Sequence, residues 1–172
     1  ESSYLRLVSV KWPMPFAYPS DHRQEVGKGW IVREGSDAVV FGYGPWLLAN
    51  AFEAAAELER TTGLSIRLVN LPWLNRVDSS WLRDAVGDRR SIVTLDNHYL
   101  RGGQGEMLAA AIAAMGLDPA VRVRSIGVTE LPECGTNDEV LAYHGLDVAG
   151  LVRQIRAAVG TREDAVPRSV QL

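Results

Sequence analysis

The sequence has one cysteine, no long hydrophobic run and no excess of positive charge. Cys134 has no second cysteine to pair with among the 172 residues, which predicts a reducing, cytoplasmic location. No apolar run approaches the ~20 residues of a membrane-spanning helix, and no signal peptide opens the sequence. The net charge of -3 gives no basic footprint for a polyanion. We therefore expect no nucleic acid and no membrane among its partners.

Apolar residues make up 47% of the chain, enough to bury the core of one domain. Apolar or β-prone runs predict five strands, at residues 28–33, 38–43, 64–70, 92–95 and 121–128. Amphipathic or capped runs predict helices at residues 45–61, 78–86, 107–115 and 147–159, with a short further helix that opens at 136–139. Strands that alternate with helices over short connections predict an α/β sheet with helices on both faces.

The most informative stretch covers residues 91–115. An apolar strand at 92–95 is followed by a polar connection at 96–101, then by three glycines within residues 102–105. The helix expected after them is apolar on every side. A helix with one buried face would carry charge on the other face, so we expect this helix to be covered twice, by its own sheet and by another surface such as a second subunit.

The glycines do not form a dinucleotide-binding fingerprint. That motif needs three glycines in the pattern G-x-G-x-x-G directly after a strand, and Leu108 stands where the third should be. A second candidate that begins at Gly42 fails in the same way at Leu47. The lysine of a phosphate-binding P-loop is absent as well. Neither NAD or FAD binding nor nucleotide hydrolysis is therefore expected.

Few side chains suggest catalysis. His98 lies in a predicted loop close to Asp96, where it could act as a general base or a substrate contact, or serve only as a hydrogen-bonded loop residue. His22 and His144 lack the spacing of metal ligands. Cys134 has no assignable base, so a plain thiol is expected. By itself the chain offers no complete catalytic set, and we assign no catalytic, cofactor-binding or metal-binding residue to it.

The N-terminal part predicts a domain boundary. Residues 11–20 hold three prolines among aromatic side chains, which forbids helix and favours an extended linker. Before it, residues 4–8 are β-prone, and a strand at the very terminus usually belongs to a sheet built by upstream sequence. We therefore expect a piece of a longer or split protein. Its parts would be a strand of an upstream domain (1–10), a linker (11–27), the main domain (28–160) and a disordered tail (161–172).

Three ordered blocks, at residues 34–78, 91–115 and 131–147, resemble the C-terminal part of the thiamine diphosphate-dependent transketolase family. In the second block, Asp96, Asn97 and His98 stand at the family's acidic-and-histidine positions, although an acidic residue is common where this chain has Asn97. The same blocks occur in deoxyxylulose phosphate synthases and in the β subunits of 2-oxo acid dehydrogenases. The histidine favours the transketolase branch.

This resemblance implies a three-layer α/β/α fold with a five-stranded, mostly parallel sheet and one antiparallel strand. Thiamine diphosphate and Mg²⁺ would be bound outside this chain, by upstream diphosphate-binding and pyrimidine-binding domains or by a separate subunit. Residues 1–10 would then be the last strand of the pyrimidine-binding domain, and the assembly a homodimer or a heterotetramer.

The resemblance also implies a role for two side chains and an activity for the whole enzyme. Arg6 resembles the arginine that binds the sugar phosphate, since a guanidinium grips phosphate with two hydrogen bonds, and His98 would be a second substrate contact. The enzyme would transfer a two-carbon ketol unit between sugar phosphates. This chain would serve dimerisation and active-site completion and would be inactive alone. The alternatives are the C-terminal part of a 2-oxo acid dehydrogenase β subunit and a non-catalytic interaction module.

Overall fold

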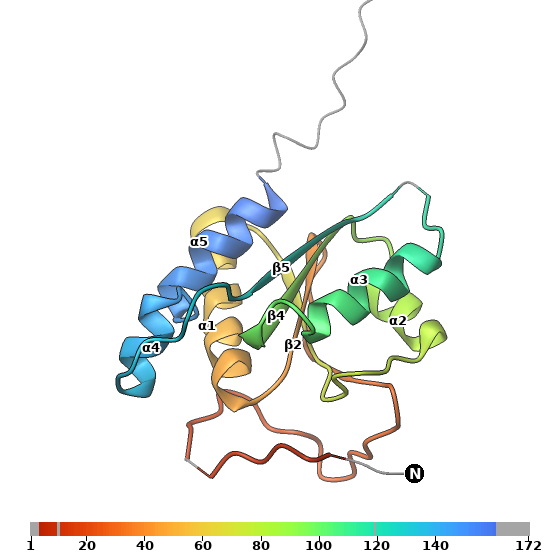
Figure 1. Ribbon diagram of the computed structural model, residues 1–172. Helices are drawn as coiled ribbons and strands as arrows, with labels where there is room; N and C mark the ends of the chain where they lie inside the picture. The colour runs from red at the N-terminus through yellow and green to blue at the C-terminus, as the bar shows by residue number, and fades with distance from the viewer. Residues whose placement is uncertain (1–3, 10, 119, 161–172) are drawn as a thin grey trace, which may run out of the picture.

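A computed structural model describes residues 4–9, 11–118 and 120–160, and its centre is a five-stranded sheet between two layers of helices (Figure 1). The strands lie in the order β1-β3-β2-β4-β5. Their bounds are Trp30–Arg33 (β1), Ala38–Gly42 (β2), Ile66–Asn70 (β3), Ser91–Tyr99 (β4) and Arg122–Val128 (β5). Strand β1 runs antiparallel to β3, and the other neighbours are parallel. The predicted fold class, including the single antiparallel strand, is confirmed.

The helices divide between the two faces of the sheet. Their bounds are Pro45–Thr62 (α1), Ser79–Val86 (α2), Gln104–Ala114 (α3), Asn137–Tyr143 (α4) and Val148–Val159 (α5). One apolar core joins α1 and α5 to one face, and a second joins α2 and α3 to the other (Figure 1). Within β2, Val40 faces the first core and Phe41 the second, as the two-residue alternation of a strand requires. No helix of the described residues is long and apolar enough to cross a membrane.

Local signals in the sequence set the helix ends. Gly63 ends α1 in the left-handed conformation, with φ of 71°, as predicted for a glycine stop. The side chain of Asp78 accepts a hydrogen bond from the Trp81 N–H and so caps α2. Thr136 and Glu139 form the reciprocal capping box predicted for α4. These ends could be predicted because each depends on contacts within a few residues.

One prediction about a strand was wrong, and one stays untested. Strand β4 continues to Tyr99, beyond the predicted end at Leu95, because Tyr99 pairs with Val128 of β5 and the Leu100 N–H donates to the Val128 carbonyl. The predicted polar loop at 96–101 is therefore mostly strand. At the N-terminal end, residues 4–8 pair with none of the described strands, so their expected place in the sheet of an upstream domain stays a prediction.

Helix α3 is covered on one side within this chain. Leu108 and Ile112 are buried against the sheet, whereas Ala110, Ala113 and Ala114 on the outer side are exposed. The second cover predicted from the apolar sequence is not supplied by the described residues of this chain. The outer side of α3 is therefore an exposed stripe of small side chains.

The aromatic linker is packed onto the domain. It runs beneath the sheet in Figure 1, on the side where α1 begins. Trp12 packs edge-on against Trp46, and Tyr18 packs against Trp30 with ring centres 4.6 Å apart and ring planes tilted by 37°. Asn70 Nδ2 at the end of β3 donates to the Tyr18 hydroxyl. The linker thus adheres to the carboxyl ends of the strands. The predicted disordered tail, 161–172, lies outside the described residues.

Candidate functional site

The candidate site lies where β2 and β4 end. From β2 the chain crosses through α1 to β3 on one side, and from β4 it crosses through α3 to β5 on the other. The two connections therefore leave in opposite directions and on opposite faces of the sheet. This is a topological switch point, the place where open α/β sheets bind ligands.

Asp96 organises the polar part of this region. Its side chain is fully buried, and its Oδ1 accepts hydrogen bonds from the Gln104 N–H at 2.8 Å and from the Tyr43 hydroxyl at 3.1 Å. Its Oδ2 accepts from the Gly105 N–H at 3.0 Å. The carboxylate therefore caps the N-terminus of α3, where the helix dipole favours negative charge. Asp96 is buried whereas His98 is exposed with its Nδ1 near the Tyr99 carbonyl oxygen, so the geometry does not make Asp96 the partner of His98.

The glycines allow that capping contact. A Cβ on Gly103 would lie 2.8 Å from the Asp96 carboxyl carbon, and one on Gly105 would lie 2.5 Å from Thr94 Oγ1. Any larger residue would push α3 away from β4 and from Asp96. The glycine run thus brings a helix close to a sheet, and no phosphate is needed to explain it.

Tyr43 is the titratable group whose environment is most altered. Burial raises the pKa of its phenol well above the ordinary value, and the nearby charge of Asp96 raises it further. The hydroxyl therefore stays protonated at neutral pH and acts as a hydrogen-bond donor to Asp96. This arrangement stabilises the end of β2 against the end of β4.

The two predicted substrate contacts both lie next to Asn97. Arg6 Nη1 donates to Asn97 Oδ1 at 2.9 Å, and this contact brings the N-terminal segment to the end of β4. His98 follows Asn97 in the chain and is exposed, and its Nδ1 lies 3.4 Å from the carbonyl oxygen of Tyr99. Both side chains are therefore open to a ligand on the same edge of the sheet.

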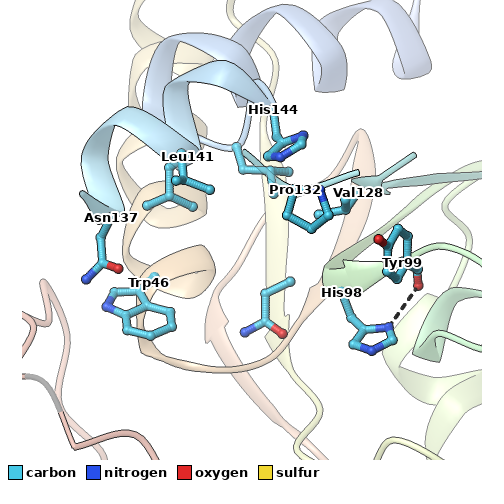
Figure 2. A pocket seen from close by; sticks show the side chains of 11 residues that line it. Trp46, His98, Tyr99, Val128, Pro132, Asn137, Leu141 and His144 are labelled. Carbon is cyan, nitrogen blue, oxygen red and sulfur yellow. Dashed lines mark hydrogen bonds between the residues drawn. The ribbon is translucent and has the colours of Figure 1, made fainter. Parts of the chain in front are cut away.

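A pocket of about 300 Å³ opens beside this edge. Figure 2 shows Asn137 and Leu141 of α4 on one side, and His98 and Tyr99 at the end of β4 on the other. Trp46, from the first turn of α1, lies across from the β4 residues (Figure 2). The remaining lining residues are Asn97, Val128, Pro132, Val140, His144 and Leu146. The lining is mainly apolar, with two asparagines and two histidines as its polar members.

Sequence reasoning did not assign Trp46 or His144 to a site. Each carries a buried ring nitrogen, Trp46 Nε1 and His144 Nε2, that has no hydrogen-bond partner in the described part of the chain. His144 ends α4 and Trp46 begins α1, about a hundred residues apart in the chain. Only the fold brings them together, so no local pattern could have revealed the pocket. Cys134 is exposed and free, as predicted for a plain thiol.

The described residues do not fit a diphosphate with its magnesium ion. The N–H groups at the start of α3 already donate to Asp96, whose charge would repel a phosphate. Within residues 4–160 as described, no three His, Cys, Asp or Glu side chains lie close enough together to hold a metal. The turn before α3 therefore lacks the free N–H groups of Gln104 and Gly105 that a phosphate would use.

Comparison with known proteins supports the resemblance noted in the sequence. Residues 27–151 match the family described as "Transketolase, C-terminal domain". The 1-deoxy-D-xylulose-5-phosphate synthase of Syntrophotalea carbinolica is 30% identical over 156 residues, which cover 84% of this chain and 24% of that protein. The transketolase of Mus musculus is 27% identical over 143 residues, 83% of this chain and 22% of that protein. The chain thus spans about a quarter or less of these relatives.

A solved structure shares the fold. It is described as a split gene transketolase in the form of an inactive β4 tetramer, and it superposes with a TM-score of 0.70 at 26% sequence identity. The similarity covers 85% of this chain and 46% of that one.

Proposed function

The chain belongs to the family of transketolase C-terminal domains, and from this we propose that it is the C-terminal domain or subunit of a thiamine diphosphate-dependent, transketolase-like enzyme. The observation that carries the proposal is the match of residues 27–151 to that family. The whole enzyme would transfer a two-carbon ketol unit between sugar phosphates. Alone, the chain would be inactive, and its single exposed Cys134 suits the reducing cytoplasm in which we place it.

We place the cofactor on other domains. The buried capping role of Asp96 supports this, because its carboxylate occupies the Gln104 and Gly105 N–H groups at the start of α3 and would repel a diphosphate. Residues 1–10 would complete the sheet of the pyrimidine-binding domain, which would give the unpaired residues 4–8 the neighbour that a strand needs. The linker at 11–27, packed by its aromatic side chains, would then fix that domain against this one.

The chain would contribute two things to the assembled enzyme. The exposed alanines of α3 would face another subunit, in a homodimer or a heterotetramer. The likeness to a split gene transketolase described as a β4 tetramer supports an oligomer. Arg6 and His98 would complete the substrate site, with the Arg6 guanidinium gripping a phosphate and the His98 ring donating a further hydrogen bond.

A non-catalytic interaction module is the second candidate. It is favoured by the same structural relative, which is described as inactive. The two candidates differ in what upstream sequence they need. An enzyme needs domains that hold the cofactor, encoded in the same or a neighbouring reading frame, whereas a module does not.

The proposal is tested by assembling the enzyme from its two parts. The chain is combined with the polypeptide that carries the cofactor-binding domains, and turnover is measured with a ketose phosphate donor and an aldose phosphate acceptor. Turnover that needs both pieces is the expected result. Turnover with a 2-oxo acid donor alone would favour the synthase or dehydrogenase branch. Turnover that is the same without this chain would contradict the proposal.

Variants of the assembled enzyme test the two side chains. Arg6→Ala is expected to raise the KM for the phosphorylated substrate by about 10-fold to 100-fold, because a hydrogen bond to a charged group contributes about 1.5–3 kcal/mol. The matched control is Arg23→Ala, which removes an exposed arginine of the linker. If His98→Ala leaves both KM and turnover unchanged, His98 is only a structural residue.

A further inference from the structure

We propose that the pocket between α4 and the end of β4, lined by Trp46, Tyr99 and Leu141 among others, binds a small planar, apolar molecule that carries an anionic group. This ligand would differ in chemistry from the sugar phosphate substrates, but it would share Arg6 and His98 with the substrate site of the proposed function, on which this inference rests. The pocket lies at the switch point of the sheet, and its apolar walls have no role in the proposed reaction.

The shape and lining of the pocket select a planar apolar body. Its volume of about 300 Å³ is at the small end for a small-molecule site. Trp46 and Tyr99 offer aromatic surfaces, and Val128, Val140 and Leu141 offer aliphatic ones. A sugar would bring several hydroxyl groups into this surface, and each unpaired hydroxyl would cost free energy. An aromatic ring has no such groups to satisfy.

The charge around the pocket selects an anion. None of its lining residues is acidic, and the two histidines, His98 and His144, can donate hydrogen bonds. Arg6 brings a full positive charge to the rim through Asn97 Oδ1. Because Asn97 is a neutral amide, its hydrogen bond leaves the charge of Arg6 available to a ligand.

One wall of the pocket can adjust to its occupant. Helix α4 supplies Asn137, Val140 and Leu141 to the lining, yet no residue of α4 is buried. Its ends are held by local contacts, the capping box at Thr136 and the turn that leads into α5. A helix with so little buried surface can shift at low cost. We therefore expect α4 to close on the ligand while the sheet side stays fixed.

The experiment follows the indole N–H signal of Trp46 in nitrogen-15 NMR spectra of the full chain, identified by Trp46→Phe. Four probes are titrated: phenyl phosphate, benzyl alcohol, benzylamine and inorganic phosphate. The first three share one ring and differ in charge. Phenyl phosphate is expected to shift the Trp46 signal saturably, with a Kd at least about tenfold below that of every other probe. Equal binding of benzylamine or of inorganic phosphate would overturn the proposal, as would no shift with phenyl phosphate.

Three variants locate the binding and its charge dependence. Val140→Trp fills the pocket and should abolish binding, whereas Ala142→Trp adds the same side chain at an exposed position of α4 and should leave Kd unchanged within about twofold. Asn97→Asp keeps the shape but pairs with Arg6, so it should weaken phenyl phosphate at least about tenfold and leave benzyl alcohol unchanged. Binding that survives Val140→Trp, or that ignores Asn97→Asp, contradicts the proposal. Asn97→Asp decides the matter alone if Val140→Trp does not fold.

Discussion

Replacing Asp96 by alanine should destabilise the domain far more than the loss of an ordinary helix cap. The carboxylate is fully buried and accepts three hydrogen bonds, from the N–H groups of Gln104 and Gly105 and from the hydroxyl of Tyr43. Alanine would leave these three donors without an acceptor in a site that water reaches poorly. The perturbation therefore acts on α3, β2 and β4 together.

The expected magnitude follows from the three donors. A buried donor that loses its acceptor costs about 1–3 kcal/mol, and local rearrangement recovers part of this loss. We expect Asp96→Ala to lower the free energy of unfolding by about 3–5 kcal/mol. That is a large share of the total of about 5–15 kcal/mol that a domain possesses.

Urea unfolding followed by circular dichroism measures the effect. The matched control is Asp147→Ala, which removes the N-cap of α5 and its single bond from the Gly150 N–H at 2.9 Å. An N-cap of that kind contributes about 1 kcal/mol. If the two alanine variants lose the same stability, Asp96 is a simple cap and the reasoning about the buried cluster is wrong.

Three further results are expected. Gly105→Ala should cost about 1–3 kcal/mol in calorimetric stability, because its methyl group would lie 2.5 Å from Thr94 Oγ1, and an unchanged Tm would contradict the close packing of α3. Burial raises the pKa of Tyr43, so its contribution to stability is complete below about pH 10 and falls at higher pH. Tyr43→Phe should remove this alkaline loss of stability in urea titrations. A loss that persists in the variant would refute the assignment of the effect to Tyr43. Hydrogen bonds from Thr136 hold the pKa of Glu139 below its ordinary value. The stabilisation of α4 by the Glu139 carboxylate is therefore complete above about pH 4.3 and is lost as the pH falls further. NMR should show that Glu139→Gln makes the stability of α4 insensitive to this acid range.

Much of the fold could be predicted because its signals are local. The glycine stop at Gly63, the cap at Asp78 and the capping box at Thr136 each depend on contacts within four residues. The strands of the parallel core are apolar on both faces and therefore stand out in the sequence. The resemblance to a known family added the one antiparallel strand.

The candidate site could be predicted only in part. The sequence predicted Arg6 and His98 as substrate contacts, which stays a prediction, whereas the pocket itself depends on residues far apart in the chain, such as Trp46 and His144. The end of β4 was misjudged because polar residues from Asp96 onward suggested a loop. Pairing with β5 keeps them extended instead. Contacts of this kind are set by the tertiary fold and leave no periodic pattern.

The measurement that tests the central claim most directly is a calorimetric titration of thiamine diphosphate with Mg²⁺ into the purified chain. Our account predicts no detectable binding, because the start of α3 is occupied by the carboxylate of Asp96 and the cofactor belongs to other domains. Saturable binding in the micromolar range would place a cofactor site in this chain. The assignment of the chain as a partner domain would then be wrong.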